Sequence, residues 1–419
     1  MSESFLAASS SSIGGRQSQE DRVVAIHDLN EHIPEGNRAQ LDPSRSFFAV
    51  FDGHGGHACS DFLAKSFHVE LARSPLLRSD PKAALLEVWR SLDGEFYKIC
   101  EATSRSAACR TATAAARNVD DERQSSVGDG ARVERSGGDT VVPRPSSTAI
   151  FPRDGSTATV LLIVGNKLFA ANCGDSAGVL TKKDGGVEML TKDHGTVNPS
   201  EIARIERLGG FFREQTIKTT KSWPFCCVKR DTVVGKPRVY PGGLLVTRSF
   251  GDFSAKVVSL GGKPGVILPD CEEIVEMTVG ADWSDLVIAS DGVWDVVSPN
   301  EIRQLLARLD AGEAASSWAS SAAEATTTIS DLRGNEKKGG KDRRQGGDET
   351  TRLKHAQLKA TCAKLVLSCI RHSYWGEHRA VADNASVVIL RFLTPEVPRE
   401  ASEEHASGRR SGEPSTAVI

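Results

Sequence analysis

The chain has 419 residues, of which 39% are hydrophobic and 26% charged, a composition typical of a soluble globular protein. Lysine and arginine number 52 against 55 aspartate and glutamate, so the formal net charge is −3 and a nucleic-acid partner is not expected. No apolar run approaches the roughly 18 residues that a membrane span needs, and the first residues lack a secretory signal. We therefore expect an intracellular protein, cytoplasmic or nuclear, without a membrane span.

Short segments rich in β-branched and aromatic residues predict the strands of the core. In chain order they are 47–51, 159–164, 167–171, 286–289 and 386–392. Gly165 and Asn166 separate the second strand from the third by two residues that suit a tight turn, which predicts an antiparallel hairpin.

Apolar residues at helical spacing predict helices between these groups of strands. They cover about 61–73, 82–100 and 356–370, and two more begin with capping-box signals, at Asn198 with Glu201 and at Ser298 with Glu301. Helices and strands do not alternate one for one, so the pattern indicates an α+β protein in which helices cover layered sheets.

Three segments are biased in composition and show no apolar period. They are 102–150, 311–352 and 395–419. We expect all three to be disordered, because they cannot bury enough apolar surface to offset the entropy lost on ordering. The folded domain is then predicted over 11–394, with the first two segments as insertions and the third as a C-terminal tail.

Aspartates stand at the ends of the predicted strands. Asp52, Asp175 and Asp291 each follow a hydrophobic strand, and Asp383 with Asn384 precedes the last one. If these ends converge, the carboxylates repel one another unless cations lie between them. Hard oxygen ligands favour Mg²⁺ or Mn²⁺, and nine scattered cysteines without a Cys-x-x-Cys pair argue against zinc.

Each of these residues also has a simpler interpretation when taken alone. A single Asp-Gly pair at a strand end is most often a turn. Glu20 and Asp21 by themselves read as surface charges, and His54 as a loop histidine. Gly55 and Gly56 lack the Lys-Ser/Thr of a Walker loop, which argues against an ATPase.

Taken together, a series of segments resembles, in order, the motifs of the metal-dependent protein serine/threonine phosphatases of the protein phosphatase 2C family. The segments are Gly15-Arg16 with Glu20-Asp21, 48–56, Gly155-Ser156-Thr157-Ala158, 172–176, Asp193-His194, 204–210, 247–252, 289–295 and Asp383-Asn384. The resemblance extends over about residues 11–394 apart from the two biased insertions.

The resemblance implies a four-layer α-β-β-α sandwich of two antiparallel sheets, with two Mg²⁺ or Mn²⁺ ions at one edge between the sheets. It implies that Asp52 bridges the two ions and that Asp291 and Asp383 complete the protein ligands of one. The backbone carbonyl of Gly53 and, through water, Glu20 would serve the other.

Three further acidic residues take lesser roles by the same resemblance. Asp21 would lie behind the ligands rather than among them. Asp175 and Asp295 would hold, together with Asp291, a third and weaker ion.

The activity implied is hydrolysis of phosphoserine and phosphothreonine by direct attack of a water that bridges the two ions. Arg16, whose planar fork matches phosphate oxygens, would bind the phosphoryl group. His54 would be the general acid that protonates the departing alkoxide. Phosphoproteins are the expected substrates, and we expect a monomer.

Two alternatives remain open: a catalytically inactive scaffold of the same fold, and a phosphatase of a small phosphate ester. The sequence also departs from the family pattern, because Ala177 stands where an arginine is usual. Residues 211–240 fall where the family has a variable flap, which is a candidate determinant of substrate choice.

Overall fold

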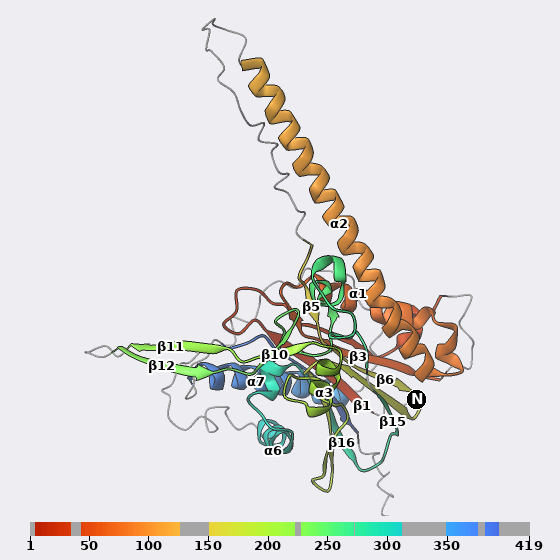
Figure 1. Cartoon of the computed structure of the whole chain (residues 1–419). Coiled ribbons are helices and arrows are strands. Elements are labelled where there is room, and N and C mark those ends of the chain that lie inside the picture. The colour runs from red at the N-terminus through yellow and green to blue at the C-terminus, as the bar shows by residue number, and fades with distance from the viewer. Residues whose placement is uncertain are drawn as a thin grey trace, which may run out of the picture.

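Two five-stranded antiparallel sheets form the centre of the structure, a computed structural model that describes residues 5–34, 43–125, 151–222, 228–271, 273–311, 349–375 and 382–393 (Figure 1). The first sheet has the spatial order β15 (Ile274–Thr278), β7 (Lys167–Cys173), β6 (Ala158–Val164), β3 (Arg45–Phe51) and β2 (Arg22–Ile26). The second has the order β1 (Phe5–Ser12), β17 (Ala385–Phe392), β16 (Trp283–Ala289), β8 (Ala177–Lys182) and β9 (Val187–Met189). All five predicted strands are present, and the 165–166 turn joins β6 to β7 as predicted.

The central strands are buried on both faces, which explains why they read as continuous apolar runs. In β3, Phe47 and Phe51 pack into a cluster beneath the helices, whereas Phe48 and Val50 pack into a second cluster between the sheets. This division follows from the alternation of side chains along a strand. The sheets therefore pack face to face through their own side chains.

Helices cover the outer face of each sheet. The first sheet packs against α1 (Ala58–Arg73) and α2 (Pro81–Ser125), and the second against α6 (Pro299–Asp310) and α7 (Glu349–Trp375). In Figure 1 these two pairs lie on opposite sides of the sheets. The predicted four-layer α-β-β-α sandwich is confirmed, since each of the three boundaries between layers has its own hydrophobic cluster.

Helix α2 is longer than the sequence analysis predicts. It continues as a helix to Ser125 and projects from the body of the protein (Figure 1), so the first part of the segment expected to be disordered, 102–125, is helical. This stretch is rich in alanine and has neither glycine nor proline. Helix formation needs only such local propensity, whereas the missing apolar period bears on burial.

The rest of the three biased segments lies almost wholly outside the described residues. Residues 126–150, 312–348 and 394–419 belong to this part of the chain. Helix α7 begins at Glu349, so the last residues of the second predicted insertion are helical.

Shorter elements complete the described structure. A small sheet consists of β14 (Phe250–Gly251), β5 (Gly155–Ser156) and β4 (Gly53–His54), and the predicted flap contains two strand pairs, β10 (Phe211–Arg213) with β13 (Arg238–Tyr240) and β11 (Thr216–Ser222) with β12 (Val228–Val234). Short helices are α3 (Pro199–Arg207), α4 (Phe253–Lys256), α5 (Asp291–Trp294), η1 (Leu29–His32), η3 (Pro75–Arg78) and η4 (Val258–Leu260). Within the described part of the chain, no helix combines the length and apolar character needed to cross a bilayer.

The two predicted capping boxes have different outcomes. At α6 the Glu301 carboxylate accepts from both the backbone N–H and the hydroxyl of Ser298, as predicted (3.0 and 2.6 Å). At α3 the Asn198 side chain accepts from the N–H of Ser200, but Glu201 does not reach back to the cap. Glu201 is instead buried against two arginines, which hold its carboxylate more strongly than a cap N–H does.

Candidate active site

A cavity of about 450 Å³ lies where strands of both sheets end. Every site residue predicted from the sequence lines it except Asp295 and the outer residue Asp21. The lining residues predicted for ions or catalysis are Arg16, Glu20, Asp52, Gly53, His54, Asp175, Asp291 and Asp383. The convergence predicted from aspartates at strand ends is therefore present in the fold.

Close backbone approach brings two of the carboxylates together. Asp291 is the first residue of α5, and a Cβ on the following Gly292 would lie 2.0 Å from the backbone oxygen of Asn384. Only glycine allows α5 to begin this near to the residues just before β17. Asp291, which follows β16, and Asp383, which precedes β17, consequently face the same cavity.

The loop between β1 and β2 is held against this edge by Asn384. Its side-chain oxygen accepts from the backbone N–H of Glu20 (2.8 Å), and its amide donates to the carbonyls of Ile13 and Ser18. This places Arg16 at the cavity, where its guanidinium donates to Asp383 at 2.5 Å. Asn384 follows Asp383 in the sequence, but its role in holding this loop is visible only in the structure.

Asp52 and Asp21 are fixed by hydroxyl groups. The backbone N–H of Asp52 donates to the Thr157 hydroxyl, and the N–H of Thr157 donates back to the Asp52 carbonyl (3.2 and 2.9 Å). Asp21 is buried and accepts from the hydroxyl of Ser290, the residue before Asp291. Asp21 is thus buried and is not among the residues that line the cavity.

The cavity concentrates negative charge. Burial, and next the like charges of Asp21, Asp291 and other nearby carboxylates, raise the pKa of Asp52 well above its ordinary value. The pKa of Asp291 is raised for the same reasons, by burial and then by Asp175 and Asp383. Buried carboxylates with such pKa values are costly to ionise unless a cation is present.

The donor set fits a hard divalent cation, because carboxylate and carbonyl oxygens are what Mg²⁺ and Mn²⁺ prefer. No three carboxylate, imidazole or thiolate groups among the described residues lie close enough to bind one ion as they stand. The Asp383 carboxylate forms an ion pair with Arg16. The residues are gathered in one cavity, and binding an ion would require side-chain rearrangement there.

Of the two residues predicted to hold a third ion with Asp291, the structure places one in the cavity and one outside it. Asp175 lines the cavity, and burial followed by the charge of Asp193 raises its pKa to about 6. Asp295 is exposed and forms an ion pair with Lys236, which precedes β13 (3.2 Å). Asp295 therefore has an ammonium group beside it.

His54 has a partner that the sequence analysis did not assign. Its Nε2 lies 2.7 Å from Oδ2 of Asp252, a buried carboxylate 198 residues further along the chain. Burial alone would lower the pKa of His54, but the charge and hydrogen bond of Asp252 outweigh this and raise it. The signal was present in the motif 247–252, whose last residue is Asp252.

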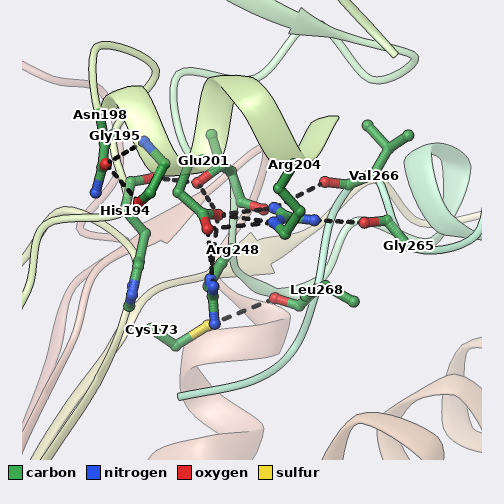
Figure 2. A network of polar contacts seen from close by, with 12 residues as sticks. Cys173, His194, Gly195, Asn198, Glu201, Arg204, Arg248, Gly265, Val266 and Leu268 are labelled. Carbon is green, nitrogen blue, oxygen red and sulfur yellow. Dashed lines mark hydrogen bonds and ion pairs between the residues drawn. The ribbon is translucent and has the colours of Figure 1, made fainter. Parts of the chain in front are cut away.

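A buried polar network fixes the segment that leads to Asp252 (Figure 2). Glu201 of α3 binds Arg248 and Arg204 at 2.7 Å each and accepts from the Thr247 hydroxyl at 2.8 Å. Burial would raise the pKa of Glu201, but the hydrogen bonds from Arg248, Arg204 and Thr247 lower it to about 2. The motifs that contain Arg204 and Arg248 therefore have a structural role.

His194 lies in the same network and is held neutral. Burial, and then the charge of Arg248, lower its pKa to about 4. Its Nδ1 accepts from the backbone N–H of Gly174 at 3.3 Å, which an uncharged imidazole can do (Figure 2 shows its position beside Glu201). The Asp193-His194 motif thus positions backbone rather than supplying a proton donor.

Comparison with solved structures identifies the fold. The chain is similar to a serine-threonine phosphatase 2C from Toxoplasma gondii, with a TM-score of 0.55 and 18% identity over 93% of this chain and 96% of that one. A phosphatase from a pathogenic strain of the same organism has a TM-score of 0.50 and 17% identity, covering 94% and 95% of the two chains. At such low identity the likeness defines the fold alone, a sandwich of two sheets covered by helices.

Sequence comparison supplies the family. The model of the family Protein phosphatase 2C matches residues 7–331, and the chain belongs to this family. It is 30% identical to "Probable protein phosphatase 2C 16" of Oryza sativa subsp. japonica over 70% of this chain, and 29% identical to "Probable protein phosphatase 2C 43" of Arabidopsis thaliana over 68%. It covers 50% and 52% of these two relatives, so it spans about half of their length.

Proposed function

We propose that this protein is a metal-dependent protein serine/threonine phosphatase. One observation carries the proposal: Asp52, Asp291 and Asp383, from three distant parts of the chain, line one cavity with Arg16 and His54. A purely structural role explains an aspartate at one strand end, but it does not explain why an arginine and a paired histidine face the same acidic cavity.

Divalent ions are the cofactor that this cavity is suited to hold. Mg²⁺ or Mn²⁺ bound by Asp52, Asp291 and Asp383, with the Gly53 carbonyl and Glu20 alongside, would neutralise phosphoryl charge and lower the pKa of a water enough for it to attack phosphorus. Asp175 is the residue best placed to hold a further, weaker ion, since it lines the cavity and Asp295 does not.

Arg16 would bind the phosphoryl group of the substrate. Its side chain is half exposed at the cavity and already makes a charge-assisted hydrogen bond to Asp383. A phosphoryl dianion offers two oxygens in the geometry of the guanidinium fork, so it competes well with a single carboxylate for Arg16. Transfer of Arg16 to the substrate would also release Asp383 for an ion.

His54 would donate the proton that serine or threonine needs to leave. As the bond from phosphorus to the side-chain oxygen breaks, the imidazolium proton passes to that oxygen and the free hydroxyl departs. A positioned general acid typically accelerates such a step by about 10²- to 10⁴-fold. The Asp252 carboxylate favours the protonated imidazole that this role requires.

The proposal is tested by phosphate release from three kinds of substrate: phosphoserine peptides, phosphothreonine peptides and small phosphate esters such as glycerol phosphate. Release from the peptides with Mn²⁺ or Mg²⁺, abolished by a chelator and restored by excess ion, is the expected result. Release from the small esters alone would assign a metabolite phosphatase instead. No release from any substrate, under conditions where the ion binds, would assign a scaffold.

A further inference from the structure

We propose that Asp252 positions His54 for proton donation, by reaching across the small sheet of β4, β5 and β14. The assignment rests on the proposed function, because it concerns the general acid of that reaction. Asp252 touches neither substrate nor ion in this account and acts through His54.

The register of the small sheet brings the two residues together. His54 in β4 pairs with Gly155 in the middle strand β5, and Gly155 pairs on its other side with Gly251 in β14. Asp252 follows directly after Gly251. It therefore lies beside Gly155 on the side of β5 that faces β14, whereas His54 lies on the side that faces β4. The contact between His54 and Asp252 therefore bridges the middle strand.

Gly155 is the residue that permits this contact. A Cβ at Gly155 would lie 2.2 Å from Oδ2 of Asp252 and 2.4 Å from Nε2 of His54. Both distances are far inside van der Waals contact, so any side chain at this position would push the pair apart. This close approach explains why the Gly155-Ser156-Thr157-Ala158 motif begins with a glycine.

Asp252 has an unfavourable backbone conformation, which indicates that its side chain is required at this position. Among the described residues it is the only non-glycine residue with a positive φ, at 49°. In the left-handed region the Cβ of a residue lies too close to the following carbonyl oxygen. The carboxylate is also buried, with hydrogen bonds from Ser249 (2.6 Å) and His54 (2.7 Å). Strain and burial of a charge at one residue are typical of functional sites.

The backbone around Asp252 is anchored from α2. Asp93 of that helix accepts from the backbone N–H of Gly251 (2.8 Å) and from the Lys256 ammonium (3.0 Å). Lys256 also donates to the carbonyl of Ser249 (2.8 Å). The carboxylate of Asp252 is consequently held in place before any substrate binds, which is what a positioning group requires.

The pairing also assigns the ring nitrogens. Because Nε2–H of His54 donates to Asp252, Nδ1 is the nitrogen that delivers the proton to the leaving oxygen. The ring then recovers that proton from solvent. Loss of Asp252 would leave His54 present but free to rotate away from the leaving oxygen.

The test compares two substrates whose leaving groups differ in their need for a proton. Phosphoserine peptide releases an alkoxide that must be protonated, whereas p-nitrophenyl phosphate releases a stable phenolate. Asp252→Asn is the variant, because asparagine keeps the shape and tolerates the left-handed conformation. We expect turnover of the peptide to fall about 10- to 100-fold, as for other partners that orient a reacting group, with little change for p-nitrophenyl phosphate.

A double-mutant cycle tests whether Asp252 acts through His54. His54→Ala alone is expected to slow peptide turnover by about 10²- to 10⁴-fold, and adding Asp252→Asn to it should cost nothing more. Equal losses on both substrates, or fully additive losses in the cycle, would overturn the assignment. Inactivity of the unaltered protein on both substrates would instead contradict the proposed function itself.

Two further variants distinguish the loss of the positioning contact from a simple loss of stability. Asp285→Asn removes another buried carboxylate that is paired with a cation, Arg391, at the other end of β16 from Asp291. It should lower thermal stability without the difference between substrates. If Asp252→Asn does not fold, Gly155→Ala separates the same pair while keeping both side chains, and it should give the same difference between substrates. A Gly155→Ala variant without this difference between substrates would likewise overturn the assignment.

Discussion

At the scale of single residues, Asp52 depends most on what it binds. It is the last residue before β4, its carboxyl faces the cavity, and burial, followed by the like charges of Asp21, Asp291 and Asp175, raises its pKa. A group in this position is stabilised far more by a divalent cation than by any neighbour in the chain.

We expect Asp52→Asn to lose most Mn²⁺ affinity, because the amide carries no charge and only one oxygen. Isothermal titration calorimetry measures this directly, without reference to turnover. Asp184→Asn, at an exposed turn that binds the N–H of Gly186, is the matched control and should bind Mn²⁺ as the unaltered protein does. Unchanged affinity in Asp52→Asn would remove this residue from the ion site.

At the level of elements, the short helix α3 is attached to the 247–252 segment mainly by polar contacts. Its apolar face is narrow, with Ile205 buried, and its hold on the rest of the protein comes largely from Glu201. This carboxylate joins α3 to Arg248, while Arg204 adds hydrogen bonds to the carbonyls of Thr247, Gly265 and Val266. The network is buried, so the loss of one member leaves the others without compensation.

Glu201→Gln should destabilise the protein by about 3 kcal/mol near neutral pH, which is the equivalent of lowering a pKa from 4.5 to about 2. The folded-state pKa lies below the unfolded value, so this stability is fully present above about pH 4.5 and is lost as the pH falls toward 2. Urea unfolding at pH 7 and pH 3 measures the deficit of the variant, which should be smaller at pH 3.

The same helix supplies the control. Glu206→Gln changes an exposed carboxylate of α3 and should leave the free energy of unfolding within experimental error. A deficit in Glu201→Gln that is the same at both pH values would contradict the role of its charge.

At the scale of the whole molecule, the cavity would couple folding to the binding of the ions that we propose it holds. Its carboxylates come from β3, β7, β16 and β17 or the residues next to them, so both sheets must be packed together for the cavity to exist. An ion bound there stabilises the folded protein by mass action and relieves the repulsion among buried carboxylates.

We therefore expect the thermal midpoint of the unaltered protein to rise with Mn²⁺ concentration. At about 100 times the dissociation constant the gain is about 2.7 kcal/mol, which corresponds to a shift on the order of 5 °C for a chain of this size. Differential scanning fluorimetry with MnCl₂ and with KCl of equal ionic strength measures it. A midpoint that responds equally to both salts would show that screening, and not a site, is responsible.

Much of the fold was predictable because it depends on local pattern. The strands over 159–164 and 167–171 and the capping box at Ser298 follow from residues adjacent in the chain, and all are confirmed. The predicted end of helix α2 near residue 100 is wrong, because a missing apolar period beyond residue 101 indicates a lack of burial, whereas alanine favours a helix by itself.

The candidate site divides in the same way. The candidate residues could be named from the sequence, since an aspartate at a strand end and an Asp-Gly pair are features of adjacent residues, and the resemblance to the family motifs supplied the roles proposed for them. The pairing of Arg16 with Asp383, and of His54 with Asp252 across Gly155, could be seen only in the folded chain. A motif can name one partner, as 247–252 does for Asp252, but the pairing depends on strand register and on close backbone approach, which are set by the packing of the whole chain.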